Sequence, residues 1–100
     1  EIVYDEAAVT ANLNADGLKV VEAASDALGA VDDWTTPAID AALRSRLIEE
    51  MGLKPRHAFG PVRVALTGKK VSPPLFESLE LLGREESLRR LHAAAKLGAA

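Results

Sequence analysis

The sequence lacks cysteine and contains only two histidines, His57 and His92, which lie far apart in the chain. Disulfides and thiolate metal sites are therefore excluded, and two such distant imidazoles do not indicate a zinc site. Aromatic residues make up only 4% of the chain, too few for a sheet that stacks RNA bases. No apolar run approaches the roughly 20 residues that cross a membrane, and no basic and apolar leader opens the chain. We therefore expect a cytoplasmic protein with no membrane partner.

Basic residues are also scarce in the first part of the chain. Residues 1–43 contain nine acidic residues and one lysine, whereas residues 44–100 contain eleven basic and six acidic residues. The formal net charge of -3 conceals this asymmetry. Any surface that faces a polyanion would therefore belong to the second half. The alternative is that two solvated faces of opposite charge attract each other and bind nothing.

Length and composition indicate one domain. A chain of 100 residues with 48% hydrophobic residues can form a modest core, but it is too short for a large cleft between domains. The first residue is Glu1 rather than methionine, which suggests a piece of a longer protein. We expect residues 1–100 to be a single domain.

Apolar residues recur at helical spacing in almost every segment, and no alternating run indicates a strand. The sequence predicts helices over residues 6–12, 16–29, 36–51, 61–66, 72–82 and 84–97. Asp16 and Ser72 are expected to cap two of these helices, and Gly52 and Gly68 to end two others. Residues 54–60 are expected to be irregular. The predicted fold class is all-α, a compact bundle of five to six helices.

One predicted helix has a regular apolar repeat. Within residues 36–51, Ile39, Leu43, Leu47 and Met51 recur every four residues. Side chains with this spacing lie on one helical face. We therefore expect all four to be buried.

Catalytic motifs are absent from the sequence, which contains no G-x-S-x-G, P-loop or G-x-G-x-x-G pattern. The acidic pairs Asp32-Asp33 and Glu85-Glu86 are adjacent, so their side chains diverge on a helix. They suit capping or solvation better than acid–base catalysis. Both histidines are expected at the surface without a catalytic partner. We expect no catalytic residue, metal or cofactor in this chain.

Residues 61–83 contain the most specific part of the sequence: a short helical pattern, a glycine, two lysines and a proline-rich helix start. Arg63 can contact a phosphate or base edge with two hydrogen bonds, whereas Lys69 and Lys70 would act as less directional charges. Ser72 can cap a helix or bond a base edge. Pro73 and Pro74 offer a stiff apolar surface on which an unpaired base could lie.

Each of these features also has a structural explanation. Ser-Pro-Pro is a common helix opening, Gly68 can simply end a helix, and Phe76 can belong to the core. The residues alone therefore leave both nucleic-acid binding and a structural role open.

Four sequence blocks occur in a fixed order in the second half: PVRVALTG at 61–68, VSPPLFE at 71–77, LLGRE at 81–85 and LRRL at 88–91. In order and spacing they resemble the C-terminal end of bacterial glutamyl-tRNA synthetases. The resemblance covers residues 38–91 and is only compositional over residues 1–35. Val62 stands where the family usually has leucine, and Pro74 where glycine is common.

The resemblance implies an all-α anticodon-binding domain of a ligase that attaches glutamate to tRNA-Glu, with ATP and magnesium used in the catalytic part. It matches Arg63 to an arginine that faces the anticodon loop, and Ser72, Pro73 and Leu75 to positions that contact anticodon bases. Thr67 and Gly68 match a turn that shapes the site. The candidate anticodon-binding residues are Arg63, Thr67, Gly68, Lys69, Lys70, Ser72, Pro73, Pro74 and Leu75.

Two other functions compete with this one. A helical protein-interaction module would use the apolar face of the last two helices, including Leu79 and Leu88. A helix-turn-helix DNA-binding protein would read DNA with residues 72–82, which carry Glu77 and Glu80 and no basic residue. We therefore expect tRNA-Glu as the partner of a monomer, and no DNA. The sequence leaves open whether the ligase distinguishes tRNA-Glu from tRNA-Gln.

Overall fold

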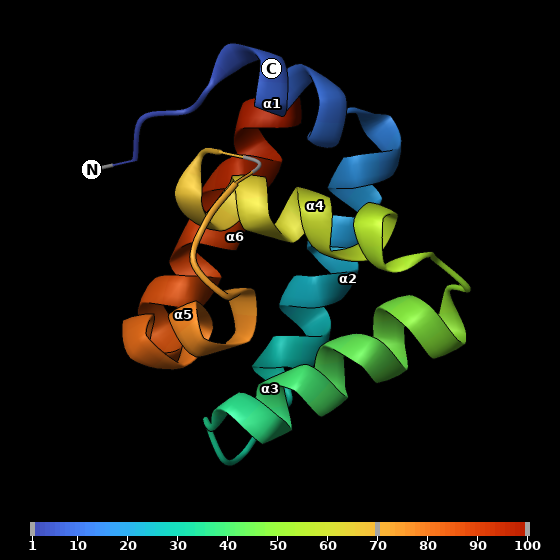
Figure 1. The fold of residues 1–100 in the computed structure, drawn as a ribbon, viewed down its shortest axis with the longest axis vertical. Coiled ribbons are helices and arrows are strands. Elements are labelled where there is room, and N and C mark those ends of the chain that lie inside the picture. Colours follow the sequence, from blue (N-terminus) through green and yellow to red (C-terminus); the bar gives the residue numbers. More distant parts are fainter. Residues whose placement is uncertain (1, 70, 100) are drawn as a thin grey trace.

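The structure, a computed structural model, describes residues 2–69 and 71–99 as a bundle of helices without strands (Figure 1). The helical segments are α1 (Glu6–Asn12), α2 (Ala15–Gly29), α3 (Thr36–Leu43), the π-helix η1 (Arg44–Glu50), α4 (Pro55–Thr67), α5 (Leu75–Leu82) and α6 (Arg84–Ala99). The predicted all-α class is confirmed. No helix in these two ranges is both long and apolar enough to cross a membrane.

The core lies where α2, α4 and α6 pack against one another, while α3 and α5 pack together beside them (Figure 1). The fully buried leucines and isoleucine come from every one of these regions. They are Leu28, Ile39, Leu43, Leu47, Leu66, Leu79 and Leu91. Trp34, in the connector before α3, donates from its Nε1 to the carbonyl of Leu79, 2.9 Å away. This bond ties the α2–α3 connector to α5.

The first two helices begin at side-chain caps. Asp5 accepts from the amide of Ala8 at α1, and Asn14 accepts from the amide of Gly17 at 2.9 Å at α2. The expectation that Asp16 caps α2 is wrong, because Asn14 precedes the helix and has the extended backbone of a cap. Asp16 lies inside the first turn, where a carboxylate favours the helix dipole.

The third helix changes its winding along its length. Ile39, Leu43 and Leu47 are fully buried as expected, but Met51 is 39% exposed. From Arg44 onward the turns are π-helical, and the amide of Met51 bonds the carbonyl of Arg46, five residues back. A π-turn contains more residues than an α-turn. The four-residue repeat therefore no longer directs Met51 into the core.

The expectation of irregular structure over residues 54–60 is wrong, because α4 begins at Pro55 and passes through Pro61. Pro55 has no unsatisfied donor at the first helical position. Pro61 lacks the N–H that would continue the ladder, but Ala58 and Val62 on both sides of it are fully buried. Packing of these neighbours holds one continuous helix where local rules indicate a break.

The start of α5 also differs from expectation. The helix begins at Leu75, its cap position is Pro74, and no side chain caps it. A residue that precedes proline is disfavoured in the helical region. Pro73 precedes Pro74, so the helix cannot begin at Pro73, and Ser72 has no first helical turn next to it to cap. The Ser72 hydroxyl is thereby released for other contacts.

A left-handed glycine ends α4. Gly68 has φ 81°, and its carbonyl accepts from the amide of Asp5 at 2.7 Å. A Cβ added at Gly68 would lie 2.4 Å from the carbonyl oxygen of Val3. By contrast, Gly52 has φ 71°, with nothing within 4 Å of such a Cβ. Gly68 is thus needed both for its backbone angle and for the close approach of the N-terminal segment.

Replacing Gly68 by alanine should destabilise the fold more than replacing Gly52. Gly52→Ala incurs only the left-handed backbone cost of roughly 1–2 kcal/mol, whereas Gly68→Ala adds the overlap with the Val3 carbonyl. The free energies of unfolding should be measured in urea by circular dichroism. Equal losses for the two variants would contradict the importance of this close approach.

Candidate nucleic-acid interface

The structure joins two of the residues singled out in the sequence. Arg63, half-buried on α4, donates from its Nε to the Oγ of Ser72, 3.0 Å away. The Ser72 hydroxyl in turn donates to the carbonyl of Pro73 at 2.9 Å. No other residue that the structure describes forms a hydrogen bond or ion pair with the Arg63 guanidinium. Its two terminal nitrogens therefore remain available as a fork of N–H donors.

Thr67 organises the turn that follows α4, between Arg63 and Ser72. Its Oγ1 donates to the carbonyl of Arg63 at 2.8 Å and accepts from the amide of Lys69 at 3.2 Å. Gly68, next to it, is buried, whereas Lys69 is exposed. Thr67 and Gly68 thus shape the turn from within, and Lys69 carries its charge to the surface. Lys70 lies outside the described residues.

The remaining candidates lie at the beginning of α5. Pro73 and Pro74 are exposed, whereas Leu75 is only 4% exposed and packs in the core. Because the two prolines fix their own φ angles, they present a stiff apolar surface beside Ser72. Leu75 supports that surface from behind in this structure.

An arginine and two aromatic rings lie close to this surface, and sequence reasoning missed them. Phe59 and Phe76 pack edge to face with centroids 5.3 Å apart, and the Arg44 guanidinium lies 5.5 Å and 5.6 Å from the two rings. Phe59 precedes Arg63 by one helical turn of α4. Arg44 also pairs with Asp40. The only signal in the sequence was the four-residue spacing of Phe59 and Arg63, since Arg44 comes from another helix.

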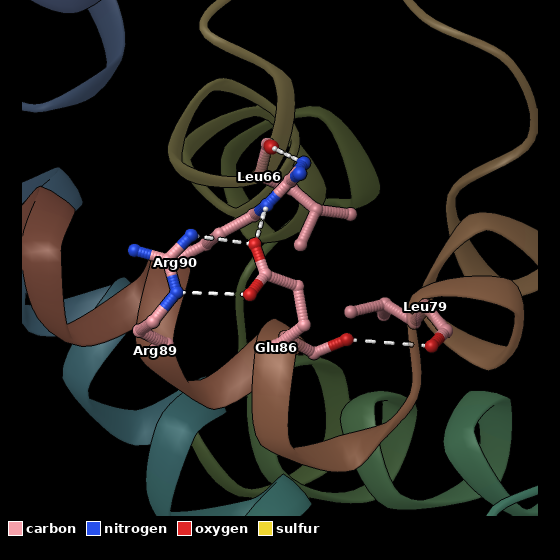
Figure 2. A network of polar contacts seen from close by, with 6 residues as sticks. Leu66, Leu79, Glu86, Arg89 and Arg90 are labelled. Carbon is pink, nitrogen blue, oxygen red and sulfur yellow. Dashed lines mark hydrogen bonds and ion pairs between the residues drawn. The ribbon is translucent and has the colours of Figure 1, made fainter. Parts of the chain in front are cut away.

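Two further arginines bind within the protein, as Figure 2 shows. Arg90 donates to the carbonyl of Leu66 at 2.9 Å and to Glu86 at 2.7 Å, and Arg89 donates to Glu86 at 2.6 Å. Hydrogen bonds from Arg89 and then Arg90 lower the pKa of Glu86 from 4.5 to about 2. Glu86 therefore stays ionised and holds Arg90, which links α6 to the end of α4. This is more than the solvated role expected for Glu86.

A family model described as an anticodon binding domain matches residues 1–95. The chain belongs to the anticodon-binding domain family. Curated relatives include a glutamate–tRNA ligase of Mycolicibacterium paratuberculosis, 57% identical over 94 residues, and one of a Nocardioides species, 61% identical over 90 residues. These matches cover 94% and 90% of this chain, but only 19% and 18% of the relatives. The chain thus spans about a fifth of their length.

A solved structure has the same fold as this anticodon-binding domain. It is the crystal structure of a glutamate tRNA ligase from Elizabethkingia meningosepticum in complex with its amino acid, and it superposes with a TM-score of 0.85 at 22% identity. The match covers 93% of this chain and 18% of that one. At this identity the likeness establishes the arrangement of the helices.

The histidines of the anticodon-binding domain differ from expectation in one respect. Both are exposed, but the Nε2 of His92 lies 2.9 Å from the Oγ of the buried Ser25. The expected surface position is confirmed for both histidines, and His92 has a hydrogen-bond partner that sequence reasoning missed. No carboxylate among the described residues bonds to His92. The serine and histidine therefore lack the acidic residue that orients the imidazole in a catalytic triad. The pair joins α6 to α2.

The anticodon-binding domain also has a surface pocket of about 570 Å³ away from the Arg63–Ser72 contact. It lies where the α1–α2 corner meets the end of η1 and the start of α4. Lys19, Met51, Arg56 and His57 are among its lining residues. None of the candidate anticodon-binding residues lines it.

Replacing Glu86 by glutamine should lower the unfolding temperature at neutral pH, because two arginines lose their carboxylate partner. A folded-state pKa of about 2, below the ordinary value of 4.5, means that the stabilisation is complete above about pH 4.5 and is lost as the pH falls toward 2. The difference between wild type and Glu86→Gln should shrink accordingly in thermal unfolding followed by circular dichroism.

The matched control for this titration is Glu85→Gln, because Glu85 is exposed and pairs with no described cation. It should leave the unfolding temperature nearly unchanged at neutral pH. A Glu86→Gln difference that stays constant from pH 7 to pH 2 would show that the ion pairs do not stabilise the fold.

Proposed function

We propose that this chain is the part of a glutamate–tRNA ligase that reads the anticodon of tRNA-Glu. Membership of the anticodon-binding domain family and the names of the curated relatives support this proposal. In this proposal residues 1–100 are one domain, and the ligase works in the cytoplasm as a monomer. The domain contributes to catalysis by holding the tRNA in place.

One observation carries the proposal: the Arg63 fork lies beside an exposed proline surface. The Arg63 Nε is bound to Ser72, and the two terminal nitrogens remain free to bond a base edge or a phosphate. Pro73 and Pro74 lie next to Ser72 and are exposed. Sequence-specific RNA recognition mostly targets unpaired bases, which can stack on side chains and be read at their edges. This combination suits an anticodon loop.

Charges around the fork would orient the RNA backbone. Lys69 follows the turn, and Arg44 lies over the ring of Phe59, which precedes Arg63 by one turn of α4. A cation held over aromatic rings is ordered and keeps its charge at the surface. We propose that these residues, together with Lys70, make contacts that do not depend on the base sequence. Thr67, Gly68 and Leu75 act from within by shaping the turn and supporting the prolines.

ATP and magnesium are the cofactors of the proposed ligase as a whole. The residues that the structure describes contain no group of three His, Cys, Asp or Glu side chains that could hold a metal ion. We therefore assign no step of glutamate activation to them, and the reaction belongs to the rest of the ligase.

The two competing functions receive no support from the fold. Leu79 is fully buried and Leu88 is partly buried against the core. The core thus takes up the two leucines expected to meet a protein partner, and Leu81 of α5 is left 88% exposed. In α5, Glu77 and Glu80 are exposed. An acidic helix would repel duplex DNA.

Arg63→Ala should weaken binding of tRNA-Glu by the ligase that contains this domain. The loss of a bidentate contact costs about 1–3 kcal/mol, which is roughly a 5- to 150-fold rise in Kd. Filter binding of the whole ligase to tRNA-Glu measures this change, and kcat/KM for aminoacylation should fall in parallel.

The matched control is Arg84→Ala. Like Arg63, Arg84 is a half-buried arginine. It lies over the ring of Trp34 at 5.6 Å and forms no described contact with a candidate residue. It should leave tRNA binding unchanged. An unaltered Kd for Arg63→Ala, or equal losses for both variants, would overturn the assigned site. A duplex DNA of equal length should compete poorly with an anticodon stem-loop.

A further inference from the structure

The hydroxyl of Ser72 is already committed within the protein. A serine hydroxyl has one hydrogen to donate, and Ser72 donates it to the carbonyl of Pro73 at 2.9 Å. The same oxygen accepts the Nε of Arg63 at 3.0 Å. Ser72 could donate to a base only by giving up its bond to Pro73. Its hydrogen and one of its two lone pairs are thus used within the protein.

The position of this hydroxyl is fixed by the chain on both sides of it. Ser72 precedes Pro73, so its backbone is confined to extended conformations, and the two consecutive prolines stiffen the chain after it. The bond to the Pro73 carbonyl then restricts rotation of the side chain. Ser72 is thus a rigid acceptor at the edge of α4.

The rigid Ser72 hydroxyl restricts the side chain of Arg63, the other partner in the hydrogen bond. An arginine side chain has several rotatable bonds, and ordering it on binding costs conformational entropy. The backbone carbonyl of Arg63 is held by Thr67 at 2.8 Å, and its Nε is held by Ser72. Because the guanidinium is planar, fixing the Nε also fixes the direction of the two terminal nitrogens. The fork is ordered before any ligand arrives.

We propose that Ser72 is a positioning residue, which aims the Arg63 fork at the RNA and does not itself read a base. This inference rests on the proposed function of the Arg63 site. It gives Ser72 a different role from the base contact that the family resemblance implies.

A double-mutant cycle tests the inference in the ligase that contains this domain, with Kd for tRNA-Glu as the readout. Ser72→Ala alone should weaken binding roughly 3- to 10-fold, which corresponds to the net contribution of one ordinary hydrogen bond. In the Arg63→Ala background the same change should have no further effect. The two substitutions should therefore be fully coupled.

Two further variants separate positioning from general damage to the connector. Ser72→Thr keeps the hydroxyl and should bind like wild type, whereas Ser72→Val has nearly the same shape without it and should bind like Ser72→Ala. Ser78→Ala is the matched control, because Ser78 bonds the carbonyl of the neighbouring Pro74 at 2.8 Å but contacts no arginine. It should leave Kd unchanged. Unfolding midpoints should confirm that each variant is folded.

The possible outcomes distinguish this inference from the proposed function. If Ser72→Ala weakens binding equally in the presence and absence of Arg63, then Ser72 contacts the RNA directly and the inference is wrong, although the anticodon site stands. If Ser72→Ala or Ser72→Val binds like wild type, the inference is also wrong. If Arg63→Ala itself has no effect, the proposed function fails first.

Discussion

The last turn of α4 is the constraint on which the rest of the structure depends. Its carbonyls accept bonds from two distant parts of the chain: Leu66 from Arg90 of α6, and Gly68 from Asp5 of the N-terminal segment. The left-handed backbone of Gly68 allows the N-terminal segment to lie against this turn. Through Thr67 the same turn leads to Lys69. The turn that begins the candidate site at Thr67 is therefore held by α6 and by the N-terminal segment as well as by α4 itself.

The arginines of the second half have two different tasks. Arg89 and Arg90 pair with Glu86 within α6, and Arg90 also donates to the carbonyl of Leu66, which links α6 to α4 (Figure 2). Arg63 has only its Nε occupied, by a neutral hydroxyl. Arg44 is ordered over Phe59 and Phe76 while remaining exposed. Arg89 and Arg90 thus help to hold the fold together, whereas Arg63 and Arg44 belong to the proposed interface.

The presence of most helices could be predicted from the local spacing of apolar residues. The residues at which the helices begin, end or change their winding could not. The expected burial of Ile39 and Leu43 in α3 is confirmed, because side chains with that spacing share a face in any α-helix. Pro61 misled the prediction, since packing on both sides carries α4 through it. The predicted burial of Met51 is also wrong, because a four-residue repeat in the sequence does not show that the helix changes to π-helical turns before this residue.

The sequence by itself determined the all-α class, the family blocks and the placement of Arg63 and Ser72 on either side of one short turn. These follow from periodicity, glycine and proline positions and motif spacing, all of which are local. Only the tertiary structure decided that Ser72 bonds Arg63 and that Arg44 lies over Phe59 and Phe76. Each of these depends on which distant residues meet when the helices pack, and spacing along the chain does not encode that contact.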